Sequence, residues 1–387
     1  MRLAHRHLAA AALLACSAAL NAQQVLVVDD DGGPGVDFTG LPAALQAAAD
    51  GDVLQLKAGT YPVSTLVIDG KGLVLAAEAG ANVLLTGTKL TVQNLAPGQS
   101  FTMRGLSTQF IDWWLVDDAG SVWFEDVSFD VGNAPGPGTI NAEDCENVVL
   151  TRCSVQGQTA INVFGDGVAS EAVWATRSQL TIEECTLVGG SGDLSMTTLD
   201  VPGGDGIELH DSQLFLGGSS VTGGLGATAA GGAAVLLSEG SQAWLLDSVL
   251  TGGVGAPSGQ LVKVISGFAT QLTGLQYRCE LESPKRVGET LDVVLQGPPG
   301  QPAWILKWLT PGGLIKPAWG GVLLVAPGFT VTAMGAIPPS GEISLTVTLP
   351  LLTGFEALPI YVQGAVTSAG GVRLTSASHL LLLDAGL

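Results

Sequence analysis

A short segment recurs seven times along this 387-residue chain, and the recurrence limits the folds that the chain can adopt. Successive copies begin 21 to 34 residues apart, a spacing typical of solenoid proteins. Each copy has apolar residues one and three positions after its first residue, on one face of a strand. Further apolar or small residues follow at positions six and eight, so each copy reads as strand, corner and strand. The copies begin at Ser100, Ser121, Asn147, Gln179, Gln213, Gln242 and Gln271.

The apolar positions form columns when the copies are aligned. Stacked strands would bury these columns as one continuous core, so the repeat predicts a parallel β-helix. The copies often end in a Gly pair, where we expect positive φ to turn the chain into the next coil; the pairs are Gly189-Gly190, Gly223-Gly224 and Gly252-Gly253. The column at position one is Phe101, Val122, Val148, Leu180, Leu214, Ala243 and Leu272, and the column at position three is Met103, Phe124, Leu150, Ile182, Leu216, Leu245 and Gly274.

The N-terminus predicts export. Arg2 and Arg6 precede an apolar run from Leu8 to Leu20, which indicates a secretory signal peptide over residues 1–22. This run is too short to span a membrane, and no other stretch could cross a bilayer, so we expect a protein that is secreted or held in the cell envelope. A lipoprotein cleavage box at Leu13-Leu14-Ala15-Cys16 is the alternative.

Residues 23–52 are expected to form an N-terminal strand and a capping helix. The segment 39–51 has Pro42 near its start, Leu41 and Leu45 on one face, and Gly51 at its end. Such a helix would cover the open end of the first coil of a β-helix over residues 53–280.

The strand and turn after this helix carry Asp50-Gly51-Asp52-Val53 and Gly59-Thr60-Tyr61. This run resembles the entry of right-handed parallel β-helix proteins of the pectin-lyase-like superfamily. With the repeat, the resemblance covers about residues 25–280 and implies a right-handed parallel β-helix. That superfamily includes lyases, hydrolases, epimerases and adhesins, so the resemblance implies the fold without choosing an activity.

The sequence pattern changes after Cys279, where the repeat ends. Residues 284–387 are rich in proline and read as short alternating strands separated by turns. Such a pattern predicts a small antiparallel β-sandwich domain. This domain could bind carbohydrate, attach the protein to a cell surface or cap the last coil.

Charge excludes some partners. Without Arg2 and Arg6 the chain has 13 basic and 35 acidic residues, which excludes nucleic acid. Polyuronates are repelled as well unless Ca²⁺ bridges the carboxylates. Lyases resembling this fold use Arg or Lys beside the uronate, whereas the basic residues between 100 and 280 are isolated from one another: Arg104, Arg152, Arg177, Lys263 and Arg278.

The segment 205–211 carries candidate acid–base groups. Its two apolar strand residues would point into the core, which leaves Glu208 and His210 on the outer face, flanked by Asp205 and Asp211. This set suits general acid–base cleavage of a glycoside. The alternative is structural, because Gly-Asp-Gly-Ile is also a common entry into a β-helix strand.

A second candidate is an outward column two positions after the start of each copy. Trp123, Phe215 and Trp244 lie in this column, and aromatic rings on a flat strand face can stack on sugar rings. They could equally pack under a long loop or against the C-terminal domain.

A third candidate is a cluster of carboxylates that could bind a metal ion. Asp29, Asp30 and Asp31 offer closely spaced oxygen ligands for Ca²⁺, although a solvated N-terminal turn explains them as well.

Cys153 and Cys185 occupy the same position of adjacent copies, so they could form a disulfide or a ladder of two buried thiols.

The sequence therefore predicts an exported β-helix protein that binds or organises a polysaccharide or another cell-envelope glycan. The alternative is a polysaccharide-degrading glycoside hydrolase or lyase, with the acid–base group of segment 205–211 and Ca²⁺ as a helper. Insertions at residues 132–138, 189–204 and 223–232 leave the same corner and should form a wall along one side.

Overall fold

The computed structural model describes residues 23–130, 137–160, 169–192, 201–226, 229–351, 355–368 and 370–386. The predicted signal peptide and parts of all three predicted insertions lie outside these ranges. Two compact units are present: one of residues 27–50 and 54–275, here the coil unit, and one made mainly of residues 276–387, the C-terminal unit. Among the residues described, no helix has the length and apolar character needed to cross a membrane.

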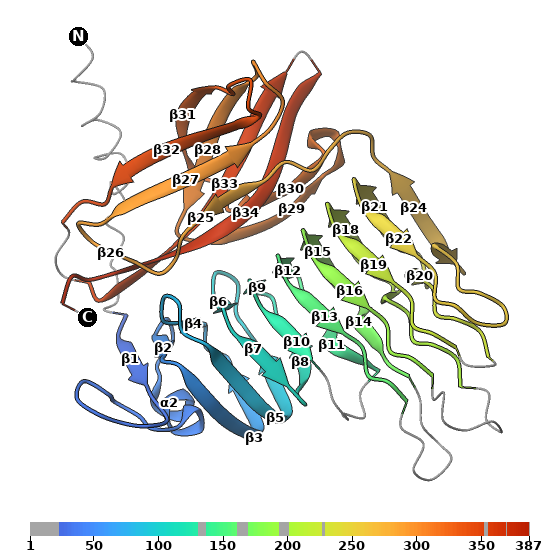
Figure 1. Cartoon of the computed structure of the whole chain (residues 1–387), viewed down its shortest axis with the longest axis horizontal. Coiled ribbons are helices and arrows are strands. Elements are labelled where there is room, and N and C mark those ends of the chain that lie inside the picture. Colours follow the sequence, from blue (N-terminus) through green and yellow to red (C-terminus); the bar gives the residue numbers. More distant parts are fainter. Residues whose placement is uncertain are drawn as a thin grey trace. The chain divides into compact units, whose positions relative to one another are not determined.

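The coil unit is a parallel β-helix with three strands in each full coil, which form three stacks (Figure 1). The first stack is β1 (Val25–Val28), β2 (Val53–Leu56), β4 (Leu73–Ala77), β6 (Ser100–Arg104), β9 (Ser121–Glu125), β12 (Asn147–Thr151), β15 (Gln179–Glu183), β18 (Gln213–Gly217), β21 (Ser241–Leu246) and β24 (Gly267–Gln271). The second is β7 (Ser107–Gln109), β10 (Ser128–Asp130), β13 (Ser154–Gln156), β16 (Thr186–Val188), β19 (Ser220–Thr222) and β22 (Val249–Thr251). The third is β8 (Asp112–Val116), β11 (Gly138–Glu143), β14 (Glu171–Thr176), β17 (Ile207–His210), β20 (Val235–Ser238) and β23 (Val262–Val264).

Two long strands join the second and third stacks at the N-terminal end. β3 (Gly59–Asp69) pairs with β5 (Val83–Gln93), and β5 pairs with β7 through its first half and with β8 through its second half. The helix α2 (Leu41–Ala47) begins with Pro42 in its first turn and buries Leu41, Ala44 and Leu45.

The predicted core columns are confirmed for the first six copies. Val148 pairs with Leu180, and Leu180 pairs with Leu214, and all three side chains are fully buried. In the second stack, Phe129 and Val155 are register partners, as are Val155 and Leu187. Apolar side chains at two-residue spacing thus stack coil upon coil into one core.

The seventh copy was aligned in the wrong register. Phe268, not Gln271, pairs with Gln242, so the last coil begins 26 residues after the preceding one. The alignment also missed an earlier coil, because β4 pairs with β6 and places Leu73 opposite Phe101. Connections between stacks vary in length, so a copy cannot be located from spacing alone.

Most corners next to the first stack are turned by residues other than Gly, with φ between 46° and 60°. They are Asn94, Asp117, Asp126, Asp144, Arg152, Arg177, Glu184, Asp211, Glu239 and Asp247. The expectation of positive φ at the Gly pairs, such as Gly189-Gly190, was wrong: none of those six residues has it.

Those glycines serve close packing instead. They lie in the connections between the second and third stacks, where backbone amides donate to carbonyls of the same or the adjacent connection at 2.7–3.0 Å. A Cβ at these positions would lie 1.8–2.2 Å from a backbone oxygen, so only Gly fits. We call this series the glycine ladder: Gly190 donates to Ser170, Gly204 to Gly190, Gly224 to Gly204, Gly232 to Gly224, Gly253 to Gly232 and Gly259 to Gly253.

Small side chains satisfy the backbone at two corners. The amide of Cys153 donates to Cys185 Sγ at 3.2 Å, and the amide of Cys185 donates to Ser219 Oγ at 3.1 Å. The amides of Cys145 and Ser178 likewise donate to the next coil's Ser hydroxyl. Cys153 and Cys185 have buried, free thiols, which is the thiol-ladder arrangement.

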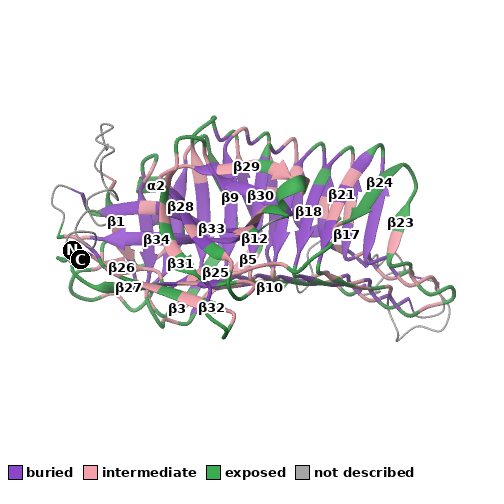
Figure 2. Cartoon of the chain, turned by 90° about the horizontal axis from the view of Figure 1, so that it is seen from above, coloured by how far each residue is buried: buried purple, intermediate pink, exposed green. Residues whose placement is uncertain are grey.

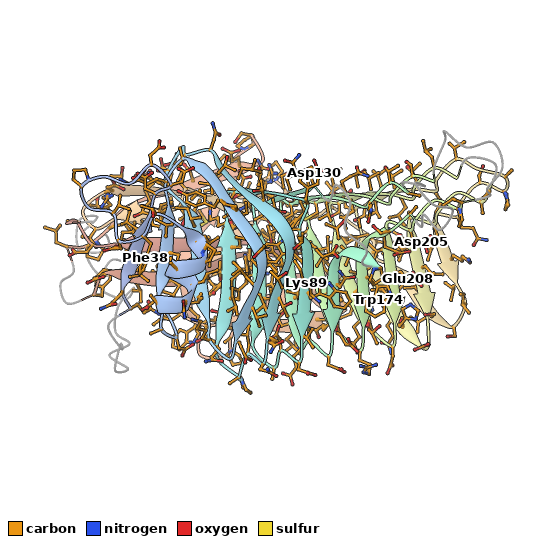
Figure 3. The ribbon with its side chains drawn as sticks, turned by 90° about the horizontal axis from the view of Figure 1, so that it is seen from below. Phe38, Lys89, Asp130, Trp174, Asp205 and Glu208 are labelled. Atoms are coloured by element: carbon orange, nitrogen blue, oxygen red, sulfur yellow. The ribbon has the colours of Figure 1, made fainter. Side chains whose placement is uncertain are left out.

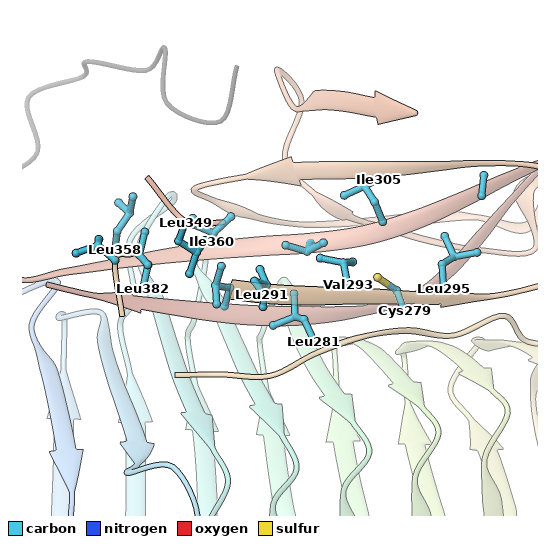
Figure 4. Packing of buried hydrophobic residues seen from close by; sticks show 14 of the residues in the cluster. Cys279, Leu281, Leu291, Val293, Leu295, Ile305, Leu349, Leu358, Ile360 and Leu382 are labelled. Carbon is cyan, nitrogen blue, oxygen red and sulfur yellow. The ribbon is translucent and has the colours of Figure 1, made fainter. Parts of the chain in front are cut away.

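The C-terminal unit consists of antiparallel sheets, apart from one parallel strand pair, β26 (Lys285–Arg286) with β34 (Gly371–Leu383), and an isolated parallel bridge between Tyr277 and Thr375. Apolar residues of β25, β27, β28, β33 and β34, among them Leu295, Ile305 and Leu382, form its core (Figure 4). The predicted boundary at residue 284 falls inside this unit, because Cys279–Leu281 pairs with the strand 290–296. The strands are β25 (Cys279–Leu281), β26 (Lys285–Arg286), β27 (Thr290–Gln296), β28 (Pro302–Trp308), β29 (Pro311–Lys316), β30 (Gly321–Val325), β31 (Thr330–Ala336), β32 (Glu342–Thr348), β33 (Ala357–Ser368) and β34 (Gly371–Leu383).

Candidate functional site

The outer face of the third stack brings together an aromatic ring, carboxylates and a histidine. β14 and β17 pair in parallel with Trp174 opposite Glu208 and Thr176 opposite His210. The alternate residues of β17, Ile207 and Leu209, are fully buried, so Glu208 and His210 point outward, as the sequence predicted. Figure 3 shows Trp174, Asp205 and Glu208 near one another on this face.

His210 links two neighbouring coils. Its Nε2 lies 2.9 Å from Glu208 Oε1, and its Nδ1 lies 2.8 Å from Ser238 Oγ on β20. The ring of Trp174 lies 5.8 Å from the His210 ring, centroid to centroid. Trp174, Glu208 and His210 are each partly exposed, so they can contact a ligand while strand pairing fixes their backbones.

Two further carboxyl groups lie beside Glu208. Burial raises the pKa of Glu171 to about 8, and the charges of Glu208 and Asp205 and a hydrogen bond with Glu208 favour the same protonated form. Burial likewise raises the pKa of Asp205 to about 6; the amide of Ala233, which donates to Asp205 Oδ1, opposes the shift. Near neutral pH, Glu171 therefore holds its proton and can donate it.

The sequence interpretation missed Glu171 and two tryptophans. Trp114 on β8 and Trp174 are each register partners of Asn141 on β11, so the two rings share a column two coils, about 10 Å, apart. Lys89 Nζ lies 4.4 Å from the centre of the Trp114 ring. A signal was present, because Trp174 and Glu208 both lie five residues before the start of a copy.

Asp211 has a different environment from the other predicted acids. It is the exposed corner residue after β17, with φ 46°, and its amide donates to the Ser238 carbonyl at 3.4 Å. Its position is explained by the turn, so we leave it out of the candidate site.

The predicted stacking column needs correction. Trp123 and Phe215 have 0% exposed surface, and a sugar can stack only on an exposed ring, so neither is retained as a stacking residue. Trp244 is partly exposed, and its ring meets that of Phe268 edge-on at 6.3 Å.

The structure brings the predicted calcium ligands together. Carboxylate oxygens of Asp29, Asp30 and Asp31 lie within 4.8 Å of one another. Asp29 also lies 3.7 Å from Lys57 Nζ, and Asp30 Oδ2 accepts the amide of Thr60 at 2.9 Å. With one oxygen each, these carboxylates supply three of the six to eight oxygen ligands that Ca²⁺ takes, so backbone carbonyls or waters would have to complete a calcium site.

The arginines that are isolated in the sequence form ion pairs between coils. Arg152 Nε lies 2.8 Å from Asp126 Oδ1, and Arg177 Nε lies 2.6 Å from Asp144 Oδ1. Both pairs join corner residues of adjacent coils. These arginines are therefore engaged in ion pairs at corners.

No protein-family model matches the chain, and no curated protein matches it. Among solved structures, Pantoea stewartii WceF, described as a glycan biofilm modifying enzyme with a bacteriophage tailspike-like parallel β-helix fold, shows 10% identity over 85% of this chain, with a TM-score of 0.19. The chain spans about half of that protein, 49% of its length. The resemblance to the pectin-lyase-like superfamily remains a prediction.

Proposed function

We propose that this protein is an exported β-helix protein that binds a glycan on the outer face of the third stack. The observation that carries the proposal is the column containing Trp114 and Trp174, with Glu208, His210 and Asp205 beside its second ring. Partly exposed rings can stack on the apolar faces of sugars, and the neighbouring polar groups can accept hydrogen bonds from hydroxyls. Strands hold these groups more rigidly than loops would.

Charge narrows the ligand class. Glu171, Asp205 and Glu208 lie together, and Lys263 is the basic group whose charge acts on Asp205. A polyuronate would bring its own carboxylates to this cluster of carboxyl groups. The proposal therefore favours a neutral glycan over an acidic one.

A glycan array tests this proposal. The wild-type protein should retain neutral oligosaccharides, and Trp174→Ala should lose this retention. Phe110→Ala is the matched control, because Phe110 is an exposed aromatic residue elsewhere in the coil unit and should leave retention unchanged. Wild-type protein that retains no glycan, or equal retention by Trp174→Ala, would reject the proposal.

Glycoside hydrolysis is the second candidate, and the protonated state of Glu171 favours it. A carboxylic acid with a pKa of about 8 can donate a proton to a leaving oxygen at neutral pH. Asp205 or Glu208 would then activate water or stabilise positive charge at the sugar. Reducing-end assays should show turnover that is lost in Glu171→Gln and Glu208→Gln and kept in Glu143→Gln, whose exposed carboxylate pairs with Arg177 on the same stack.

Export remains part of the proposal because its signal, residues 1–22, lies outside the described residues. N-terminal sequencing of protein recovered from the medium or the envelope tests it. A chain that begins near Gln23 supports export, and an intact N-terminus in the cytoplasm contradicts it.

A further inference from the structure

The last coil exposes several apolar side chains. All five residues of β24 are exposed, and so are most residues of β22 and β23 (Figure 2). Ile265 is 66% exposed and Phe268 is 45% exposed. Further exposed apolar side chains in this coil are Val249, Val254, Leu261 and Val264. Exposed apolar side chains gathered in one coil are typical of an interaction surface.

This surface differs in charge from the rest of the protein. The chain has 35 acidic and 15 basic residues, yet residues 249–275 contain no acidic residue and one basic residue, Lys263. Two copies of so acidic a protein would repel each other across most surfaces. The last coil is a place where they can approach without this repulsion.

The same coil has open strand edges. β24, β22 and β23 are the terminal strands of their stacks, so each presents unpaired backbone amides and carbonyls on one side. Soluble proteins usually protect such edges with charges, proline or a covering element. The three strands contain Lys263 as their one charged residue and no proline.

We propose that the coil unit dimerises tail to tail with a second copy of this chain through its last coil. A two-fold axis through the middle of β24 would pair it antiparallel with β24 of the second copy, and would place β22 opposite β23 of that copy. Each copy then uses the same surface, as a closed two-fold contact requires. The opposite end of the unit differs, because α2 buries its apolar face there (Figure 1).

Sedimentation velocity on the full chain tests the proposal. The wild-type protein should sediment as a dimer, and Ile265→Glu and Phe268→Glu should each sediment as monomers, because they introduce like charges across the contact. Val67→Glu is the matched control: Val67 is 54% exposed on β3, away from the last coil, and this variant should remain dimeric. Circular dichroism and thermal melting confirm that each variant is folded.

Cross-linking tests the dimer contact with a variant that should leave this contact intact. Thr270 is exposed on β24, and the native cysteines of the described chain are buried, so Thr270→Cys adds one reactive thiol. A short bismaleimide should join two copies at this position, whereas Val67→Cys should give monomers. Wild-type protein that stays monomeric at all soluble concentrations would overturn the proposal, as would dimers insensitive to both glutamate variants or assemblies that grow beyond two copies.

Discussion

Trp174 and Glu208 are register partners in adjacent parallel strands, which places an aromatic ring and a carboxylate in one column of the outer face. Because strands β14 and β17 are fixed by pairing on both sides, the spacing of these two groups is set by the fold and not by a loop. The candidate site is thus a property of the repeat itself.

The buried columns should tolerate no charge. Ile182→Asp would place a carboxylate in a fully buried position between the coils, so we expect a loss of about 4 kcal/mol or more in the free energy of unfolding, or failure to fold. Thr186→Asp in the same coil is exposed on β16 and should change this free energy by less than about 0.5 kcal/mol. Urea denaturation measures both, and comparable losses would contradict the assigned register.

The glycine ladder should be sensitive to a single methyl group. A Cβ on Gly224 would lie 1.8 Å from the carbonyl oxygen of Gly190, so Gly224→Ala should destabilise the protein by about 1–3 kcal/mol through forced backbone movement. Gly40→Ala is the control, since Gly40 has an ordinary φ and its nearest neighbour would lie at 3.9 Å. If thermal unfolding shows no difference between the two variants, the ladder does not constrain the coils as described.

Asp118 should make stability fall as pH rises. Burial raises its pKa from 3.8 to about 7, so the folded state holds the proton more tightly than the unfolded state does. The resulting stabilisation is fully present below about pH 4 and is lost as pH rises through about 7.

Asp118→Asn tests this sign. The amide oxygen can still accept the Leu95 amide, which donates to Asp118 Oδ1 at 2.9 Å, but the side chain cannot ionise. We expect the variant to be about 2–4 kcal/mol more stable than the wild type at pH 8, and its stability to fall less between pH 4 and pH 8. Parallel pH profiles for the two proteins would contradict the assignment.

The sequence predicted the features that arise from two-residue alternation. Columns such as Val148, Leu180 and Leu214 repeat a simple inward pattern, and the outward direction of Glu208 and His210 followed from the same rule. The sequence prediction failed where contacts between neighbouring coils determine which residue is needed or which residues meet. Gly224 is required by a carbonyl of another connection, and Glu171 meets Glu208 only because β14 and β17 stack.

Trp123 and Phe215 show that the burial of an outward side chain also depends on contacts that the sequence pattern does not reveal. Alternation placed them outward from the core of the coils, but it carries no information about whether an outward side chain reaches solvent. The third stack escaped detection for a related reason. Connections of unequal length separate it from the aligned positions, so Trp114 and Trp174 had no constant offset from the strands before them.

Calorimetric titration of the Trp174→Ala variant tests the central claim most directly, using the neutral oligosaccharide that the wild-type protein retains on an array. Loss of the exposed ring should weaken binding at least about tenfold, or about 1.4 kcal/mol, while Phe110→Ala binds like the wild type. Unchanged affinity in Trp174→Ala would contradict a glycan site on the outer face of the third stack.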